Sequence, residues 1–206
     1  MKIVMILFLS LLVVSCGKKN QIKVTAKNAA TGEGYADLGF RIFEVKPYTT
    51  PTGEVQELVY EGNFNANGEA VADIRLKNRS YVITTVSPGP MCYINNTQYF
   101  FHRDDDNLKF DFLFAPCAYL KLKIENVNCE GGGDLMNFRQ RQSFTKWSGW
   151  SSDRVGCYFY ESPNYQEVPS GWRIYEWVVD RDGTISSHKD SIFLTEDQEH
   201  TFEINY

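Results

Sequence analysis

Short runs of alternating apolar and polar residues recur along most of the chain. Ile22, Val24 and Ala26 alternate with lysine and threonine, and a period of two is typical of a strand with one buried face. Runs of this kind predict strands at residues 22–26, 40–45, 58–60, 70–76, 81–86, 110–114, 120–124, 157–161, 172–179, 184–187, 191–194 and 201–206. No window carries the apolar stripe of a helix, so we expect an all-β protein.

Two of these runs share a short pattern. Residues 22–28 and 120–126 both place a lysine between two apolar residues and end on an asparagine, and Lys23 and Lys121 stand 98 positions apart. Between them, Pro116 breaks the strand pattern, because proline cannot donate to a central ladder. We therefore predict two β-sandwich modules in tandem, with module 1 at residues 21–116 and module 2 at residues 117–206.

Three segments of module 1 resemble the prealbumin-like fold of carboxypeptidase-regulatory domains. They are Asn65-Ala66-Asn67-Gly68-Glu69-Ala70, Ile74-Arg75-Leu76 and Tyr81-Val82-Ile83. Arg79 stands where that family usually turns on glycine. The resemblance implies a small Ig-like or prealbumin-like sandwich of about seven strands. It implies an architecture and not an activity.

The first part of module 2 lacks a clear pattern. Residues 127–152 contain Gly131-Gly132-Gly133 and Trp147-Ser148-Gly149-Trp150, and we interpret them as one long irregular region. Loops of this length are usually functional or disordered. Further on, Asp180-Arg181-Asp182-Gly183 separates two strand patterns, which predicts a hairpin with glycine supplying a positive φ.

The N-terminus carries a different pattern. Lys2 precedes an apolar run from Ile3 to Val14, and the small residue Ser15 stands just before Cys16. The run is shorter than the roughly 20 residues of a membrane-spanning helix. It resembles the lipobox of bacterial lipoproteins. The resemblance implies a signal peptide at residues 1–15 and an acylated Cys16, with palmitate among its fatty acids, as the mature N-terminus.

The residues after Cys16 bear on the membrane and its face. Residues 16–20 form a short tether, so we expect the folded part to lie close to the lipid headgroups. The position after Cys16 holds Gly17, whereas an aspartate there would resemble an inner-membrane retention signal in enteric bacteria. The acidic residues that would resemble a surface-export signal are also missing. We therefore expect an outer-membrane anchor, on the periplasmic face in preference to the cell surface.

The composition fits a folded globule with a mild negative charge. Apolar residues make up 43% of the chain, charged residues make up 23%, and the formal net charge is -5. Nucleic-acid binding needs a concentrated basic face, and the tripeptide Arg139-Gln140-Arg141 is the nearest approach to one. We expect no nucleic acid among the partners.

Four cysteines follow the anchor, namely Cys92, Cys117, Cys129 and Cys157. In an oxidising compartment an even number of cysteines predicts two disulfides, for which there are three connectivities. Sequential pairing would close two loops of under about 30 residues, each contributing roughly 3 kcal/mol. A structural zinc site is the alternative, but no CxxC pair or neighbouring histidine gives ligand spacing.

A search for catalytic chemistry finds no constellation. His102, His188 and His200 have no metal or triad spacing, and no serine stands in a GxSxG elbow. The three glycines before Asp134 are not followed by the Gly-Lys-Ser/Thr ending of a phosphate-binding loop. Residues 104–107 lack the glycine turn and the closing glutamate of a calcium-binding loop. We expect no enzyme, metal site or cofactor, and an unrecognised hydrolase is the remaining enzymatic alternative.

Aromatic residues are concentrated in module 2. They are Trp147, Trp150, Tyr158, Tyr160, Tyr165, Trp172, Tyr175 and Trp177. Alternation puts Trp172 and Trp177 on opposite faces of one strand, so we expect one of them in the core. We expect Trp147 and Trp150 on the irregular region, where exposed aromatic rings can bind a surface.

These patterns predict a lipid-anchored envelope protein with a non-enzymatic binding or assembly function. Its partners would be the membrane, through the lipid, and another envelope protein. The alternative is a glycan-binding accessory lipoprotein that uses Trp147, Trp150 and Tyr165.

Overall fold

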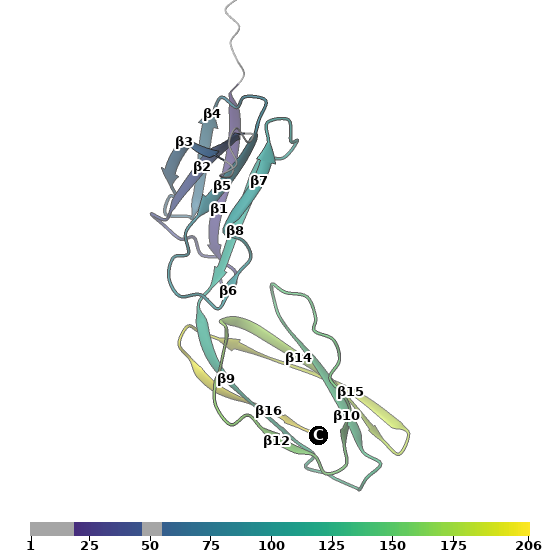
Figure 1. Ribbon diagram of the computed structural model, residues 1–206. Coiled ribbons are helices and arrows are strands. Elements are labelled where there is room, and N and C mark those ends of the chain that lie inside the picture. The colour runs from purple at the N-terminus through teal and green to yellow at the C-terminus, as the bar shows by residue number, and fades with distance from the viewer. Residues whose placement is uncertain (1–18, 47–54) are drawn as a thin grey trace, which may run out of the picture.

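The computed structural model describes residues 19–46 and 55–206. The predicted signal peptide and Cys16 lie outside these residues. Every regular element in the described part of the chain is a β-strand, so the all-β prediction is confirmed. Figure 1 shows two strand bodies placed end to end, which we call module 1 (strands β1–β8) and module 2 (strands β9–β16).

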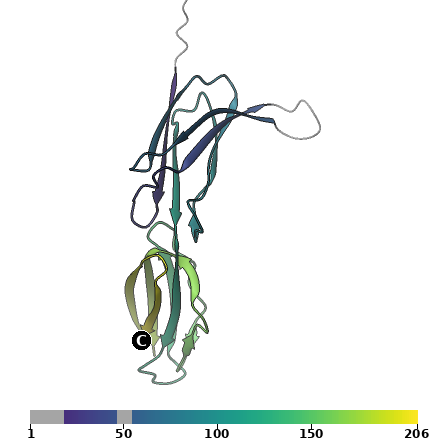
Figure 2. The same ribbon diagram turned by 90° about the vertical axis from the view of Figure 1, so that its left-hand side faces the viewer.

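Module 1 is a sandwich of two sheets. Its strands are β1 (Asn20–Asn28), β2 (Gly39–Lys46), β3 (Val55–Asn63), β4 (Glu69–Ile74), β5 (Ser80–Thr85), β6 (Tyr93–Ile94), β7 (Gln98–His102) and β8 (Lys109–Ala115). One sheet has the order β4-β1-β8-β6 and the other β3-β2-β5-β7. Alternate residues of β1 and β2 face the core, with Ile22 and Val24 on β1 against Phe40 and Ile42 on β2. Figure 2 shows the β2–β3 hairpin leaving the sandwich sideways.

Module 2 is a second sandwich. Its strands are β9 (Cys117–Glu125), β10 (Leu135–Gln142), β11 (Arg154–Val155), β12 (Phe159–Glu161), β13 (Gln166–Pro169), β14 (Gly171–Arg181), β15 (Thr184–Leu194) and β16 (Glu199–Asn205). One sheet has the order β11-β10-β14-β15. In the other, β9 pairs with β12 and β13 on one edge and with β16 on the other. Tyr175 and Trp177 belong to its core.

The two modules have the same strand order. The sheet β3-β2-β5-β7 corresponds to β11-β10-β14-β15, and the order β4-β1-β8 corresponds to β12/β13-β9-β16. In each module the first strand pairs in parallel with the last, β1 with β8 and β9 with β16. The tandem sandwich predicted from the repeated lysine pattern is therefore the observed fold. The pattern marked the repeat because Lys23 and Lys121 both lie on the first strand of a module.

A single residue joins the modules. Pro116 stands between the end of β8 and the start of β9. Across this junction the ring centroids of Tyr93 and Phe144 are 4.6 Å apart. Gly171 has φ +107°, and a Cβ placed on it would lie 2.6 Å from the Cβ of Ala30. The junction is close-packed, and it depends on a glycine at this position.

Some predicted elements need correction. The irregular region at residues 127–152 contains β10, which pairs with β14 along its full length, so that interpretation is wrong for residues 135–142. The strands expected at 184–187 and 191–194 are one continuous strand, β15. The predicted hairpin is confirmed as β14–β15, and both turn residues, Asp182 and Gly183, have positive φ.

Candidate binding surface

An irregular segment of module 2, residues 143–153, runs along the free edge of β10. The amide of Ser148 donates to the carbonyl of Gln140 at 2.8 Å, and its Oγ accepts from the Gln140 amide at 3.0 Å. Ser151 repeats both bonds with Phe138, at 2.8 Å and 3.1 Å. Each serine thus satisfies one backbone donor and one acceptor of the edge. The segment takes the position that β3 has in module 1, and it closes an edge that would otherwise be open to pairing.

The same segment carries Trp147 and Trp150, which stack with two arginines of β10. The guanidinium carbon of Arg139 lies 4.7 Å from the ring centroid of Trp147 and 4.6 Å from that of Trp150. That of Arg141 lies 4.9 Å from Trp147. The two arginines project from the same face of β10, about 6.6 Å apart along the strand. The order is therefore Arg141, Trp147, Arg139, Trp150, which we call the arginine–tryptophan ladder.

The two arginines differ in their charge partners. Glu176 lies opposite Arg139 on β14, and its carboxylate accepts from Arg139 at 2.7 Å and 2.6 Å. The side chain of Arg141 makes no hydrogen bond or ion pair with any residue that the structure describes. Its buried Nε has no partner. Stacking on a ring stabilises such a cation by about 0.5–1 kcal/mol at an exposed site.

The predicted binding aromatics do not form one surface. Trp147 is half-buried with an arginine on each side, and Trp150 is 44% exposed with one ring face covered. Tyr165 directly precedes β13 of the other sheet, and the Lys121 ammonium is 5.8 Å from its ring centroid. Lys121 points outward from β9, since Leu120 faces the core. The sandwich core therefore separates Tyr165 from the ladder.

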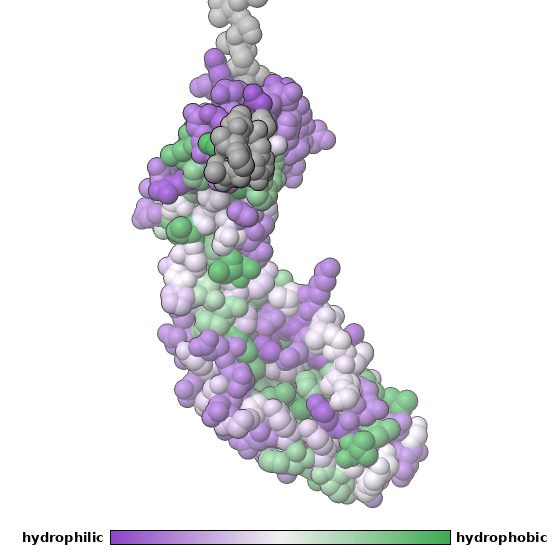
Figure 3. Space-filling view, in the orientation of Figure 1, coloured by the Kyte–Doolittle hydropathy of each residue, from purple (hydrophilic) through white to green (hydrophobic). Residues whose placement is uncertain are grey.

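The two tryptophans of β14 are placed as alternation requires. Trp177 is buried, and its ring stacks on His188 at a centroid distance of 5.5 Å. Trp172 is 47% exposed on the outer face, in contact with Phe193 of β15. The prediction that one of the two belongs to the core is confirmed. On the view in Figure 3, exposed hydrophobic residues form small separate groups among hydrophilic ones.

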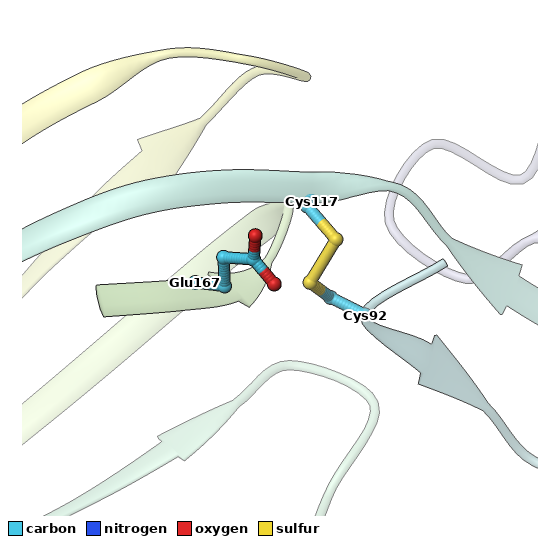
Figure 4. Close-up of side chains that lie close together, drawn as sticks. All are labelled: Cys92, Cys117 and Glu167. Atoms are coloured by element: carbon cyan, nitrogen blue, oxygen red, sulfur yellow. A yellow bond between two sulfur atoms is a disulfide. The ribbon is translucent and has the colours of Figure 1, made fainter. Parts of the chain in front are cut away.

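Both predicted disulfides are present, in the sequential pairing. Cys92 bonds to Cys117 across the junction, and Cys129 bonds to Cys157 at the far end of module 2. Figure 4 shows the Glu167 carboxylate beside the junction disulfide, with its oxygen and the two sulfurs all within 4.8 Å of one another. The sulfurs are bonded to each other and are not thiolates, so this group does not offer the ligands that zinc requires.

A polar network under the Cys129–Cys157 disulfide escaped the sequence analysis. Asp134 is buried, and its carboxylate accepts from Asn126 Nδ2 at 2.8 Å and from the Glu130 amide at 3.2 Å. These bonds, with the Asn126 contact as the larger cause, hold the pKa of Asp134 below its ordinary value. Arg181 completes the network by donating to Asn126 and to the carbonyl of Asn128. The sequence around Asp134, with three glycines before it, did not indicate that its carboxylate would be buried and hydrogen-bonded.

The histidines lie on three different sheets. His102 is on β7, His188 on β15 and His200 on β16. The structure brings Ser186 Oγ within 3.0 Å of His188 Nε2, a contact that the sequence did not suggest. Both residues are exposed, and no carboxylate in the described part of the chain is hydrogen-bonded to this imidazole. Without such a carboxylate among the described residues, the pair has no third member of a hydrolase triad.

Comparisons with known proteins give only distant likenesses. No family model matches the chain, and no curated protein matches it. Among solved structures, the minor pilin GBS52 of Streptococcus agalactiae is 12% identical with a TM-score of 0.34, over 90% of this chain and 94% of that one. The shaft pilin SpaA of Lactobacillus rhamnosus GG is 10% identical with a TM-score of 0.37, over 91% and 98%.

The Bacillus anthracis TIE protein is 13% identical with a TM-score of 0.36, over 92% of this chain. This chain spans only 34% of that one. All three TM-scores are low, and the fold assignment rests on the strand pairing described above. No helix in the described residues is long and apolar enough to cross a membrane.

Proposed function

We propose that this protein is a lipid-anchored, non-enzymatic binding or assembly module of a bacterial cell envelope. The anchor would be Cys16, held at the periplasmic face of the outer membrane. The observation that carries the proposal is the position of Asn20, four residues after Cys16. Asn20 is the first residue of β1, and Figure 1 shows β1 starting at the end of module 1 that faces away from module 2.

The direction of β1 supports this arrangement. The strand runs from Asn20 to Asn28, and two residues later Ala30 meets Gly171 of module 2. Nine residues of strand extend about 30 Å. A membrane-held Cys16 would therefore leave module 1 near the headgroups and present module 2 away from the lipid. The surfaces available to a partner would be those of module 2.

Membrane fractionation tests the anchor. We expect the wild-type protein in the detergent-soluble membrane fraction and Cys16→Ser in the soluble fraction, because serine lacks the thiol to which the lipid would be attached. Ser15→Ala is the matched control, since it keeps a small residue before the cysteine and should remain in the membrane. Membrane retention of Cys16→Ser would refute the anchor. Labelling with a palmitate analogue gives an independent readout.

Glycan binding is the second candidate, and one observation favours it. Trp150 is 44% exposed, and a flat exposed ring can stack on a sugar. Trp147 is covered by arginines on both sides, so Trp150 would have to act without it. A glycan array should then lose its signal with Trp150→Ala and keep it with Tyr165→Ala. Loss of the signal with both variants, or with neither, would contradict this use of the ladder.

A further inference from the structure

The sheet that carries the ladder has one closed edge and one open edge. Residues 143–155 cover β10 at the first edge through Ser148, Ser151 and the short strand β11. At the other edge, β15 pairs with β14 through eleven consecutive residues, and no described strand pairs with its far side. β15 and β14 are the longest described strands, and the register between them has no bulge.

The turn before β15 decides which backbone groups are free. Asp182 and Gly183 have φ of 49° and 86°, the pattern of a two-residue type I′ hairpin. In such a hairpin the flanking pair, Arg181 and Thr184, is hydrogen-bonded, and hydrogen-bonded pairs then alternate with non-bonded ones. The amides and carbonyls of residues 185, 187, 189 and 191 therefore point away from β14.

One contact agrees with this assignment. The amide of Ser191 donates to the side chain of its neighbour Asp190 at 2.7 Å, so it does not bond to β14. The amides of Ile185, Ser187 and Lys189 have no hydrogen-bond partner within the described chain. A strand that joined β15 would satisfy these groups without breaking an existing bond.

The side chains leave room for such a strand. Every residue from Thr184 to Ser191 is exposed, so neither face of this stretch is covered. Proteins usually blunt open edges with prolines, bulges, short strands or charges. β15 has no proline and no bulge. Its charged side chains are Lys189, which lies opposite Glu176, and Asp190, which lies opposite Tyr175 on the other face. The Glu176 carboxylate is already engaged by Arg139.

We propose that the outer edge of β15 binds an extended segment of a different protein by strand addition. Ile185 is 68% exposed and Lys189 points to the same face of the sheet, four positions away. The segment that fits carries an apolar residue opposite Ile185 and an acidic residue opposite Lys189, with small polar residues between them. This inference deepens the proposed function by naming the surface through which module 2 engages its partner.

Charge argues against a second copy of this chain as the occupant. When two β15 strands pair antiparallel about a two-fold axis, residues of the same face lie opposite one another. The outer-face residues at the open edge are Ile185, Ser187, Lys189 and Ser191, and none is acidic. Such pairing would leave both lysines without a carboxylate.

Two synthetic peptides provide the probe. Each has eleven residues, blocked ends and threonine at most positions, with valine and glutamate four apart in one order or the other to allow both strand directions. Their dissociation constants for the full chain are measured by fluorescence anisotropy. Hydrogen exchange of the amides of Ile185, Ser187 and Lys189 reports where the peptide binds.

We expect Ser187→Pro to weaken binding of the better peptide at least about tenfold, because proline removes an outward amide and leaves the β14 ladder intact. Ser187→Ala keeps the amide and should bind as the wild type does. Lys189→Glu should weaken the glutamate peptide about threefold and restore a lysine version of it. Circular dichroism confirms that each variant is folded.

Three outcomes would overturn the inference. They are equal binding by Ser187→Pro and Ser187→Ala, no saturable binding up to about 1 mM peptide, and a dimer of the free protein that Ser187→Pro dissociates. The last would assign the edge to a second copy. Each outcome is distinct from failure of the proposed function, since membrane retention through Cys16 is measured separately in the same variants.

Discussion

Replacing Trp147 by alanine tests whether the arginine–tryptophan ladder stabilises module 2. The change removes the contacts with Arg139 and Arg141, at 4.7 Å and 4.9 Å. Two such contacts are worth about 1–2 kcal/mol. The half-buried ring adds a similar amount of lost apolar burial. We therefore expect the free energy of unfolding to fall by about 2–4 kcal/mol.

Trp150→Ala is the matched control. It removes one contact with Arg139 from a ring that is 44% exposed, so the loss should be about 1 kcal/mol. Urea unfolding followed by tryptophan fluorescence gives both values, because all four tryptophans lie in module 2 and the signal reports that module alone.

A double-mutant cycle isolates the pair of Arg141 and Trp147. Their coupling should be about 0.5–1 kcal/mol, in the direction of mutual stabilisation. An equal loss for Trp147→Ala and Trp150→Ala, or a coupling near zero, would show that the rings are held by something other than the arginines. The ladder would then be free to act as a binding surface.

Three further predictions follow from other contacts. Gly171→Ala should destabilise the junction by at least about 2 kcal/mol in thermal unfolding, because the added Cβ would lie 2.6 Å from Ala30 and the residue has φ +107°. Gly183→Ala, where nothing lies near the Cβ, measures the cost of positive φ alone. Equal losses of stability in the two variants would show that the contact with Ala30 costs nothing. Glu167→Gln should speed reduction of the Cys92–Cys117 bond by dithiothreitol about three- to fivefold at low salt, because the wild-type carboxylate repels an attacking thiolate. Reduction of Cys129–Cys157 in the same sample is the internal reference. An unchanged rate for Cys92–Cys117 relative to this reference would refute the prediction. Asp134 should contribute stability that is complete above the ordinary aspartate pKa of about 4 and is lost as the pH falls through its lower pKa in the folded protein. The urea midpoint should therefore depend less on acid pH in Asp134→Asn, whereas Asp106→Asn should show the wild-type dependence. An unchanged acid dependence in Asp134→Asn would argue against the network.

Alternation along the chain predicted most strands, because a strand with one buried face needs apolar residues at every second position. It failed at β10. There Met136 and Phe138 face inward, but Gln140 and Gln142 continue the same face with polar groups. The outward arginines are packed by tryptophans that come several residues later, and a local pattern cannot anticipate that contact.

The candidate surfaces were only partly visible in the sequence. Trp147 and Trp150 were found through their aromatic character, but their arginine partners were not, since no spacing rule links a strand to the loop that returns along it. The edge of β15 was split into two predicted strands by its polar centre, residues 188–190. Its long open side became apparent only from the pairing.

The parallel pairing of first and last strands determines how the molecule would bear a pulling force. A load applied between the start of β1 and the C-terminus would draw β1 and β8 in opposite directions along a shared ladder of hydrogen bonds, and it would load β9 and β16 in the same way. In this shear geometry the bonds of a ladder must yield together, whereas a hairpin pulled from its open end separates one bond at a time. Each module would therefore resist extension as a unit.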